Sequence, residues 1–219
     1  MVAKKKKNRG VRVKVKICGI TNIKDALVAI KAGCDALGFA FFKESPRYLT
    51  LEKALSIIRV LPKGIVKIGV FVNSSEKTIK DIARRCCLDI LQFHGEETPG
   101  FCRKFKQYKI IKVFRVKDRL DLDSIGRYKT FAYLFDTFVK AKPGGTGKTF
   151  NWELLRYLDD IKKPIFLSGG LNAQNVRRAI KIARPAWVDV CSSVEAYPGK
   201  KNPRKVRTFI RNAKKTLSQ

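Results

Sequence analysis

Apolar and amphipathic stretches alternate along the whole chain. Each mainly apolar run is five to eight residues long, the length expected of a buried strand. After each run comes a segment with the spacing of an amphipathic helix, and Asn22 and residues 73–75 are placed to cap two of these helices. The predicted strands cover about 11–18, 35–41, 66–72, 88–93, 109–115, 131–136, 164–168 and 187–191. The predicted helices cover about 23–32, 51–61, 76–85, 97–107, 120–125, 152–158, 173–183 and 203–215.

This pattern predicts an α/β fold made of one closed (β/α)8 TIM barrel. Nearly continuous apolar strands are typical of a parallel sheet buried on both faces, and no linker interrupts the alternation. A doubly wound open sheet is the competing architecture. That fold expects a G-x-G-x-x-G turn after the first strand, where Gly19 stands alone.

The first ten residues differ in composition from the rest. They carry Lys4, Lys5, Lys6, Lys7 and Arg9, and no apolar segment follows them, so we do not interpret them as a secretory signal. We predict a flexible basic tail over 1–10 and a catalytic barrel domain over 11–219. No run of about 18 apolar residues is present, which predicts no transmembrane helix.

The formal net charge of +30 has two interpretations. It can attract polyanions or steer an anionic substrate, or it can be a compositional habit spread over solvated helix faces. Lysine and arginine are dispersed along the chain, which favours the second interpretation. A nucleic-acid contact stays possible, but we do not expect it to be the primary function.

The cysteines and the single histidine bound the chemistry. Six cysteines lie at 18, 34, 86, 87, 102 and 191 without any C-x-x-C pair, so no zinc site can be assembled from local motifs. A chain of 219 residues does not need disulfides to fold. We therefore predict free thiols, a cytoplasmic location and no metal site.

In a TIM barrel the loops that follow the strands share one face and form the site. Asp136 ends an apolar run, where a carboxylate is costly unless it faces a polar site. Cys18, at the first strand tip, is either a small buried hydrophobe or one half of an acid–base pair with Asp136. Arg47 either holds a substrate carboxylate or lies on the surface, and His94 either lines the site or caps the next helix.

Glycines and small residues after the later strands indicate a phosphate site. The loops after the seventh and eighth strands are the usual phosphate position in this architecture, where backbone N–H groups can bind the anion. The alternative is that the glycines only permit tight turns. The candidate phosphate-binding residues are Gly145, Gly169, Gly170, Ser192 and Ser193.

Taken together, seven short stretches resemble phosphoribosylanthranilate isomerase, an enzyme family of tryptophan biosynthesis. Each stretch is weak alone, but all occur in the right order at strand starts or tips, over nearly the whole chain from about residue 13. They are 16–21, 38–39 with 45–47, 69–73, 91–95, 144–147 with 152, 168–171, and 188–195.

The resemblance implies a cofactor-free Amadori rearrangement of N-(5-phosphoribosyl)anthranilate to 1-(2-carboxyphenylamino)-1-deoxyribulose 5-phosphate. It implies that Cys18 is the general base, Asp136 the general acid, and Arg47 the ligand of the anthranilate carboxylate. The expected partner is a phosphorylated small molecule, and the expected assembly is a monomer or homodimer without membrane contact.

This chain departs from the family pattern in the last of these loops. Cys191 stands where the family usually has serine, and Ser193 stands where it usually has glycine. A side chain at Ser193 can crowd the phosphate or donate a hydrogen bond to it. Two alternatives remain: indole-glycerol-phosphate synthase, whose catalytic lysine and glutamates we do not find at the strand tips, and a basic nucleic-acid-binding barrel without isomerase activity.

Overall fold

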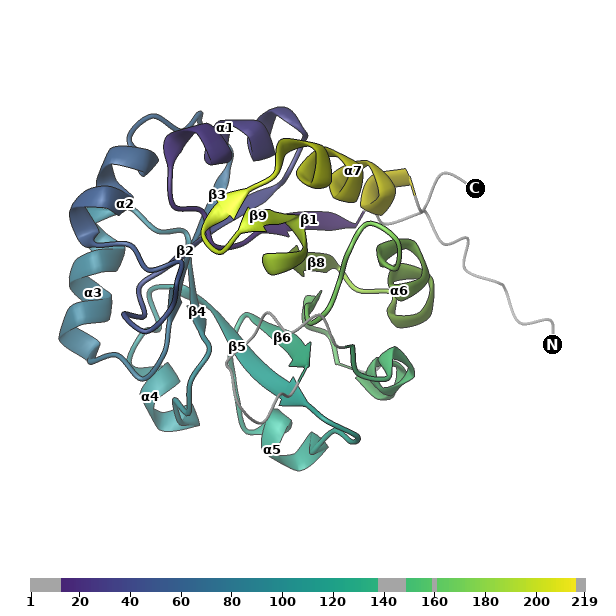
Figure 1. Cartoon of the computed structure of the whole chain (residues 1–219). Helices are drawn as coiled ribbons and strands as arrows, with labels where there is room; N and C mark the ends of the chain where they lie inside the picture. The colour runs from purple at the N-terminus through teal and green to yellow at the C-terminus, as the bar shows by residue number, and fades with distance from the viewer. Residues whose placement is uncertain (1–12, 138–148, 159–160, 216–219) are drawn as a thin grey trace.

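The computed structural model describes residues 13–137, 149–158 and 161–215, and it forms a ring of strands surrounded by helices (Figure 1). β1 (Lys14–Ile17) pairs in parallel with both β2 (Ala36–Ala40) and β8 (Trp187–Val190). This double pairing closes an eight-stranded barrel in the order β1 to β8. The predicted (β/α)8 architecture is confirmed.

The other elements follow the predicted order. The remaining barrel strands are β3 (Val66–Phe71), β4 (Ile90–Phe93), β5 (Lys109–Val116), β6 (Ala132–Thr137) and β7 (Ile165–Leu167). The α-helices are α1 (Ile23–Lys31), α2 (Leu51–Ile58), α3 (Glu76–Arg85), α4 (Pro99–Arg103), α5 (Leu122–Gly126), α6 (Val176–Ala183) and α7 (Pro203–Lys214). Two 3-10 helices, η1 (Trp152–Leu158) and η2 (Ser192–Val194), and a hairpin of β9 (Glu195–Tyr197) and β10 (Lys200–Lys201) complete the described chain.

Side-chain caps fix where several helices begin. The side-chain oxygens of Asn22, Thr50, Ser75 and Thr98 accept hydrogen bonds from backbone N–H groups in the first turns of α1, α2, α3 and α4. Such caps satisfy donors that have no acceptor within the helix. Capping at these positions explains why the predicted starts of α1 to α3 agree with the structure.

The barrel interior changes from apolar to polar along the strands. Residues two apart on a strand face the same side. In β4, β6 and β8, a buried apolar residue is therefore followed on the same face by a polar one nearer the carboxyl end: Ile90 by Gln92, Leu134 by Asp136, and Trp187 by Asp189. The apolar layer closes the amino-terminal part of the barrel, and the polar layer opens toward the carboxyl ends of the strands.

Two predicted helices differ from the structure. The predicted helix 97–107 is shortened to α4. Glu97 lies before this helix and accepts hydrogen bonds from the N–H groups of Asn73 and Gly95, and Pro99 occupies the first helical turn. Residues 152–158 form a 3-10 helix instead of an α-helix, with Asn151 accepting a hydrogen bond from the Glu153 N–H. The β9–β10 hairpin was not predicted, and the proposed tail 1–10 lies outside the described residues.

Candidate active site

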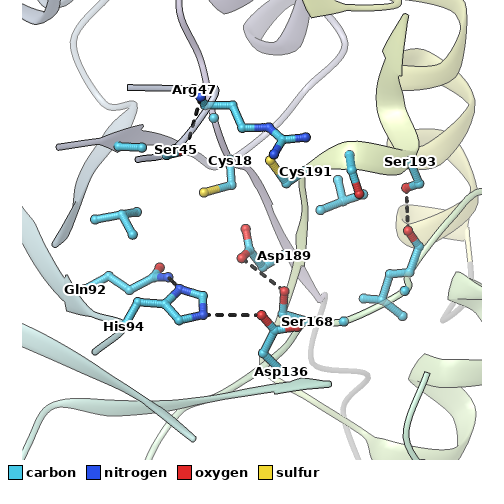
Figure 2. Close-up of a pocket in the computed structure, with 18 residues that line it drawn as sticks. Cys18, Ser45, Arg47, Gln92, His94, Asp136, Ser168, Asp189, Cys191 and Ser193 are labelled. Carbon is cyan, nitrogen blue, oxygen red and sulfur yellow. Dashed lines mark hydrogen bonds and ion pairs between the residues drawn. The ribbon is translucent and has the colours of Figure 1, made fainter. Parts of the chain in front are cut away.

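Most of the candidate site residues line one cavity at the carboxyl ends of the barrel strands (Figure 2). The structure brings together side chains and loops from almost the full length of the chain. Gly145 lies outside the described residues. The candidates that line the cavity are Cys18, Arg47, His94, Asp136, Gly169, Gly170, Ser192 and Ser193.

Cys18 follows directly after β1, where its N–H donates to the carbonyl of Val190 at 2.9 Å. Gly38 on β2 makes room for the thiol, because a Cβ atom at residue 38 would lie 2.6 Å from the Cys18 Sγ. Lys16, two residues before Cys18, is fully buried, and its Nζ contacts Asp189 at 2.9 Å. Burial alone would lower the pKa of Lys16, but the charges of Asp189 and Cys18 outweigh it and hold that pKa above its ordinary value. A permanent cation therefore lies beside the Cys18 sulfur.

The thiols of Cys18 and Cys191 share a hydrogen bond and titrate as a pair. The bond from Cys18 lowers the pKa of Cys191 to about 7, helped by Lys201 and Arg47. The same bond, together with burial, raises the pKa of Cys18, and the charge of Lys16 opposes that rise. The pair thus loses one proton readily and the second with difficulty.

Asp136 lies near the end of β6 and is 7% exposed. One carboxylate oxygen accepts a hydrogen bond from the Thr137 N–H at 2.8 Å, and the other lies 3.3 Å from the His94 Nε2. Gly169 packs against this carboxylate, since a Cβ atom there would lie 2.9 Å from Oδ1 and still closer to Thr137. Gly169 also has φ +82°, a conformation that favours glycine. Gly169 therefore shapes the wall beside Asp136.

His94 follows β4 and points into the cavity between Gln92 and Asp136 (Figure 2). Its Nδ1 lies 3.3 Å from the Gln92 Nε2, and its backbone carbonyl accepts a hydrogen bond from Arg115. The prediction left open whether His94 lines the site or caps a helix. The structure shows that His94 lines the cavity and that Thr98, not His94, caps α4.

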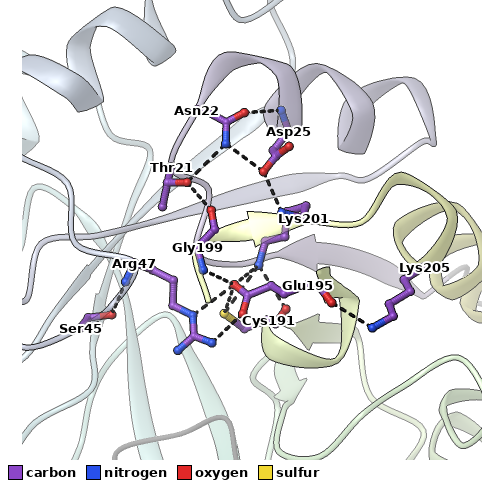
Figure 3. A network of polar contacts seen from close by, with 10 residues as sticks. All are labelled: Thr21, Asn22, Asp25, Ser45, Arg47, Cys191, Glu195, Gly199, Lys201 and Lys205. Carbon is purple, nitrogen blue, oxygen red and sulfur yellow. Dashed lines mark hydrogen bonds and ion pairs between the residues drawn. The ribbon is translucent and has the colours of Figure 1, made fainter. Parts of the chain in front are cut away.

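Arg47 is held by a buried network of charges (Figure 3). Its Nε and one Nη donate to the two carboxylate oxygens of Glu195, at 3.1 and 2.6 Å. Glu195 also contacts the fully buried Lys201 at 2.9 Å, and the Lys201 Nζ lies 3.8 Å from the Cys191 Sγ. The guanidinium is thereby fixed at the rim of the cavity with its other Nη unused by Glu195.

The loops after β7 and β8 meet at one side of the cavity. Gly169 and Gly170 both have positive φ, at +82° and +63°. Ser192 begins η2, and the first N–H groups of a helix have no acceptor within it. The Ser193 hydroxyl donates to the carbonyl of Leu171 and so ties the two loops together (Figure 2). Backbone donors in this arrangement can bind an anion.

Neither a metal site nor a membrane segment is found in the part of the chain that the structure describes. No group of three or more His, Cys, Asp or Glu side chains there is arranged to hold a metal ion. Among the same residues, no helix has the length and apolar character needed to span a bilayer.

The model of the N-(5'-phosphoribosyl)anthranilate isomerase family matches residues 15–212. The chain belongs to this family. A curated N-(5'-phosphoribosyl)anthranilate isomerase from Trichlorobacter lovleyi is 48% identical over 205 residues, which are 94% of this chain and 100% of that protein. Another from Pelobacter propionicus is 50% identical over 207 residues, covering 94% of this chain and 98% of that protein.

Solved isomerase structures have the same fold. The crystal structure of phosphoribosyl anthranilate isomerase from Thermotoga maritima has a TM-score of 0.87 and 44% identity, covering 92% of this chain and 98% of that one. A second isomerase structure, in complex with reduced 1-(o-carboxyphenylamino)-1-deoxyribulose 5-phosphate, has a TM-score of 0.84 and 42% identity over the same shares.

The sequence analysis did not predict the buried charged residues that hold the side chains of the isomerase site in place. Glu195 was part of a matching stretch but was given no role, and Lys16, Lys201 and Asp189 were not singled out. All four are at most 5% exposed. A buried charge needs a buried partner, so Lys16 and Asp189 inside predicted strands were the available signals.

Proposed function

We propose that Cys18 is the general base and Asp136 the general acid of the isomerase reaction that this chain catalyses in tryptophan biosynthesis. The reaction is an aldose–ketose isomerisation of a phosphorylated small molecule. One observation carries the assignment: a thiol from β1 and a carboxyl group from β6 line the same cavity. An acid and a base on separate strands can act on two positions of one sugar.

In the first step, Asp136 in its acid form gives a proton to the ring oxygen of the furanose. The bond between that oxygen and C1 breaks, and the nitrogen lone pair forms an iminium at C1. The ring oxygen leaves as the C4 hydroxyl, and Asp136 is left as a carboxylate. The contact with His94 at 3.3 Å supports this role, since it stabilises the carboxylate formed in this step.

In the second step, the Cys18 thiolate takes the proton from C2. The electrons of the C2–H bond form a C1–C2 double bond and neutralise the iminium, which gives an enolamine. Tautomerisation then returns a proton to C1 and leaves a ketone at C2. The fully buried Lys16 supports this role because its positive charge opposes the rise in the pKa of Cys18 that Cys191 and burial cause.

The remaining candidate residues bind the two ends of the substrate. We propose that the Nη of Arg47 that Glu195 leaves unused donates to the anthranilate carboxylate. His94 contacts the sugar between these ends. Gly169, Gly170, Ser192 and Ser193 hold the phosphate through backbone N–H groups. The sequence also predicts Gly145 as a phosphate ligand, but it lies outside the described residues. The Ser193 hydroxyl already donates to Leu171, so it ties the loops together and is not a phosphate donor.

The assembly that we propose is a monomer or a homodimer. A related isomerase structure is described as mutually generated monomers of a dimeric enzyme, which supports both assemblies for this family. The free thiols of the described residues support the cytoplasm as the compartment.

The test is a fluorescence assay of Asp136→Asn with freshly generated phosphoribosylanthranilate. The amide has nearly the same shape but cannot supply the proton, so we expect kcat to fall about 10²- to 10⁴-fold. Asp81→Asn, on the exposed face of α3, is the matched control and should keep the wild-type rate. A rate within a few-fold of wild type for Asp136→Asn would contradict the acid role.

A further inference from the structure

Cys18 and Cys191 lie at the tips of two neighbouring strands. β1 and β8 are paired in parallel with Ile17 opposite Val190, so the next residues along, Cys18 and Cys191, are also neighbours. The bond from the Cys18 N–H to the Val190 carbonyl continues this pairing past the strand end. Neighbouring strands lie about 4.8 Å apart, within the Cα separation of about 4.4–6.8 Å that disulfides require.

A glycine lies close to each sulfur, and a Cβ atom at Gly38 would lie 2.6 Å from the Cys18 Sγ. A Cβ atom at Gly19 would lie 2.9 Å from the Cys191 Sγ, so that sulfur rests on the backbone next to Cys18. Both side chains line the same cavity (Figure 2), and each thiol affects the pKa of the other.

The surroundings of the pair favour a thiolate. The Lys201 Nζ lies 3.8 Å from the Cys191 Sγ, and the positive charge of Arg47 also lowers the pKa of Cys191. The thiolate is the form of cysteine that reacts with oxidants. Both cysteines are partly exposed to the cavity, so a small oxidant can reach them.

We propose that Cys18 and Cys191 form a reversible disulfide that switches the enzyme off. The Cys191 thiolate attacks one oxygen of a peroxide, the O–O bond breaks, and Cys191 becomes a sulfenic acid while the other oxygen leaves as water after protonation. The Cys18 thiolate then attacks the Cys191 sulfur, the S–O bond breaks, and hydroxide leaves and takes up a proton to become water. Two electrons pass from the thiols to the peroxide, and a dithiol reductant reverses the change.

Loss of activity on oxidation rests on the proposed role of Cys18, since a sulfur in a disulfide cannot accept the C2 proton. Formation of the disulfide does not rest on that role. Mass and activity are therefore measured on the same sample. The base role is tested separately by Cys18→Ala in the reduced enzyme.

The experiment treats the reduced full-length protein with hydrogen peroxide in small excess. We expect the mass to fall by two hydrogens, a cross-linked peptide to join residues 18 and 191, and kcat to fall about tenfold or more as this peptide accumulates. Dithiothreitol should restore both mass and rate. Cys87→Ser, which removes an exposed thiol at the end of α3, should behave as wild type.

Cys191→Ser distinguishes the disulfide from simple oxidation of the base. In this variant peroxide should produce no cross-linked peptide. Dithiothreitol should restore activity only to molecules whose Cys18 has stopped at the sulfenic acid, and not to those oxidised further to the sulfinic acid. Circular dichroism before treatment shows whether the variant is folded. Inactivation of the wild type without the 18–191 peptide would overturn the proposal, as would full activity of a completely cross-linked sample.

Discussion

The Nε2 of His94 lies 3.3 Å from an oxygen of Asp136, so the only histidine of the chain faces the proposed general acid. Both side chains are largely buried at the cavity wall, with exposed fractions of 18% and 10%. Gln92 contacts the other ring nitrogen and fixes the plane of the imidazole. The pair places a donor beside the oxygen that becomes a carboxylate when the sugar ring opens.

Replacing His94 by alanine should lower kcat more than it raises KM. A hydrogen bond to a charged group contributes about 1.5–3 kcal/mol, which corresponds to a fall of roughly 10- to 150-fold. Steady-state assays of His94→Ala and of the control Cys87→Ser, with the melting temperature of each, provide the measurement. A raised KM with an unchanged kcat would mean that His94 only binds substrate.

Arg47→Lys tests the carboxylate site. Lysine keeps the charge but cannot hold Glu195 with two nitrogens and present another to the substrate. We expect KM to rise about tenfold or more with a smaller change in kcat, since the interaction exists in both ground and transition states. Wild type and Arg47→Lys should bind a product analogue without the carboxylate with equal affinity. If Arg47→Lys binds this analogue more weakly, Arg47 does not act on the carboxylate.

The strand order and most strand tips could be predicted because they depend on local pattern. Apolar runs such as 131–136 and caps such as Asn22 are readable within a few residues. The β9–β10 hairpin was not predictable in this way. Its two lysines are fixed by Asp25, which is distant in the sequence: the Lys201 N–H donates to one carboxylate oxygen and the Lys200 Nζ to the other.

The site was predicted where a reactive side chain ends a strand, as with Cys18 and Asp136. It was not predicted where a residue acts through another one. Lys16 meets Asp189 across 173 residues and Arg47 meets Glu195 across 148, pairings that no spacing rule supplies. The contact of Cys18 with Cys191 depends likewise on closure of the barrel between β8 and β1.

Glu195 should contribute stability that depends on pH. Burial alone would raise its pKa, but hydrogen bonds from Arg47 and the charge of Lys201 lower it below the ordinary 4.5. Its contribution is therefore complete above about pH 4.5 and is lost as pH falls through the lower native pKa. We expect Glu195→Gln to lower the free energy of unfolding by about 3–5 kcal/mol at neutral pH.

Urea unfolding of both proteins over a pH series measures this difference. The gap between wild type and Glu195→Gln should narrow in acid, because protonation of Glu195 removes the same charge as the substitution. If the difference in unfolding free energy does not change with pH, the charge of the Glu195 carboxylate does not contribute to that difference.

The paired thiols should react with iodoacetamide in two stages. With the pKa of Cys191 lowered to about 7, its thiolate fraction and its alkylation rate should rise as pH increases through that value. Cys18 should follow at higher pH, since its pKa is raised. Peptide mapping identifies which cysteine is alkylated at each pH, and Cys191→Ser should lose the stage that belongs to Cys191. If the same stage near neutral pH persists unchanged in this variant, another thiol causes it.

The most direct test of the account is the single-turnover rate of Cys18→Ala at saturating enzyme with freshly generated phosphoribosylanthranilate. The account predicts a rate about 10²- to 10⁴-fold below wild type, with product-analogue affinity and melting temperature close to wild type. A folded Cys18→Ala variant that turns over its substrate at the wild-type rate would contradict the assignment of Cys18 as the base.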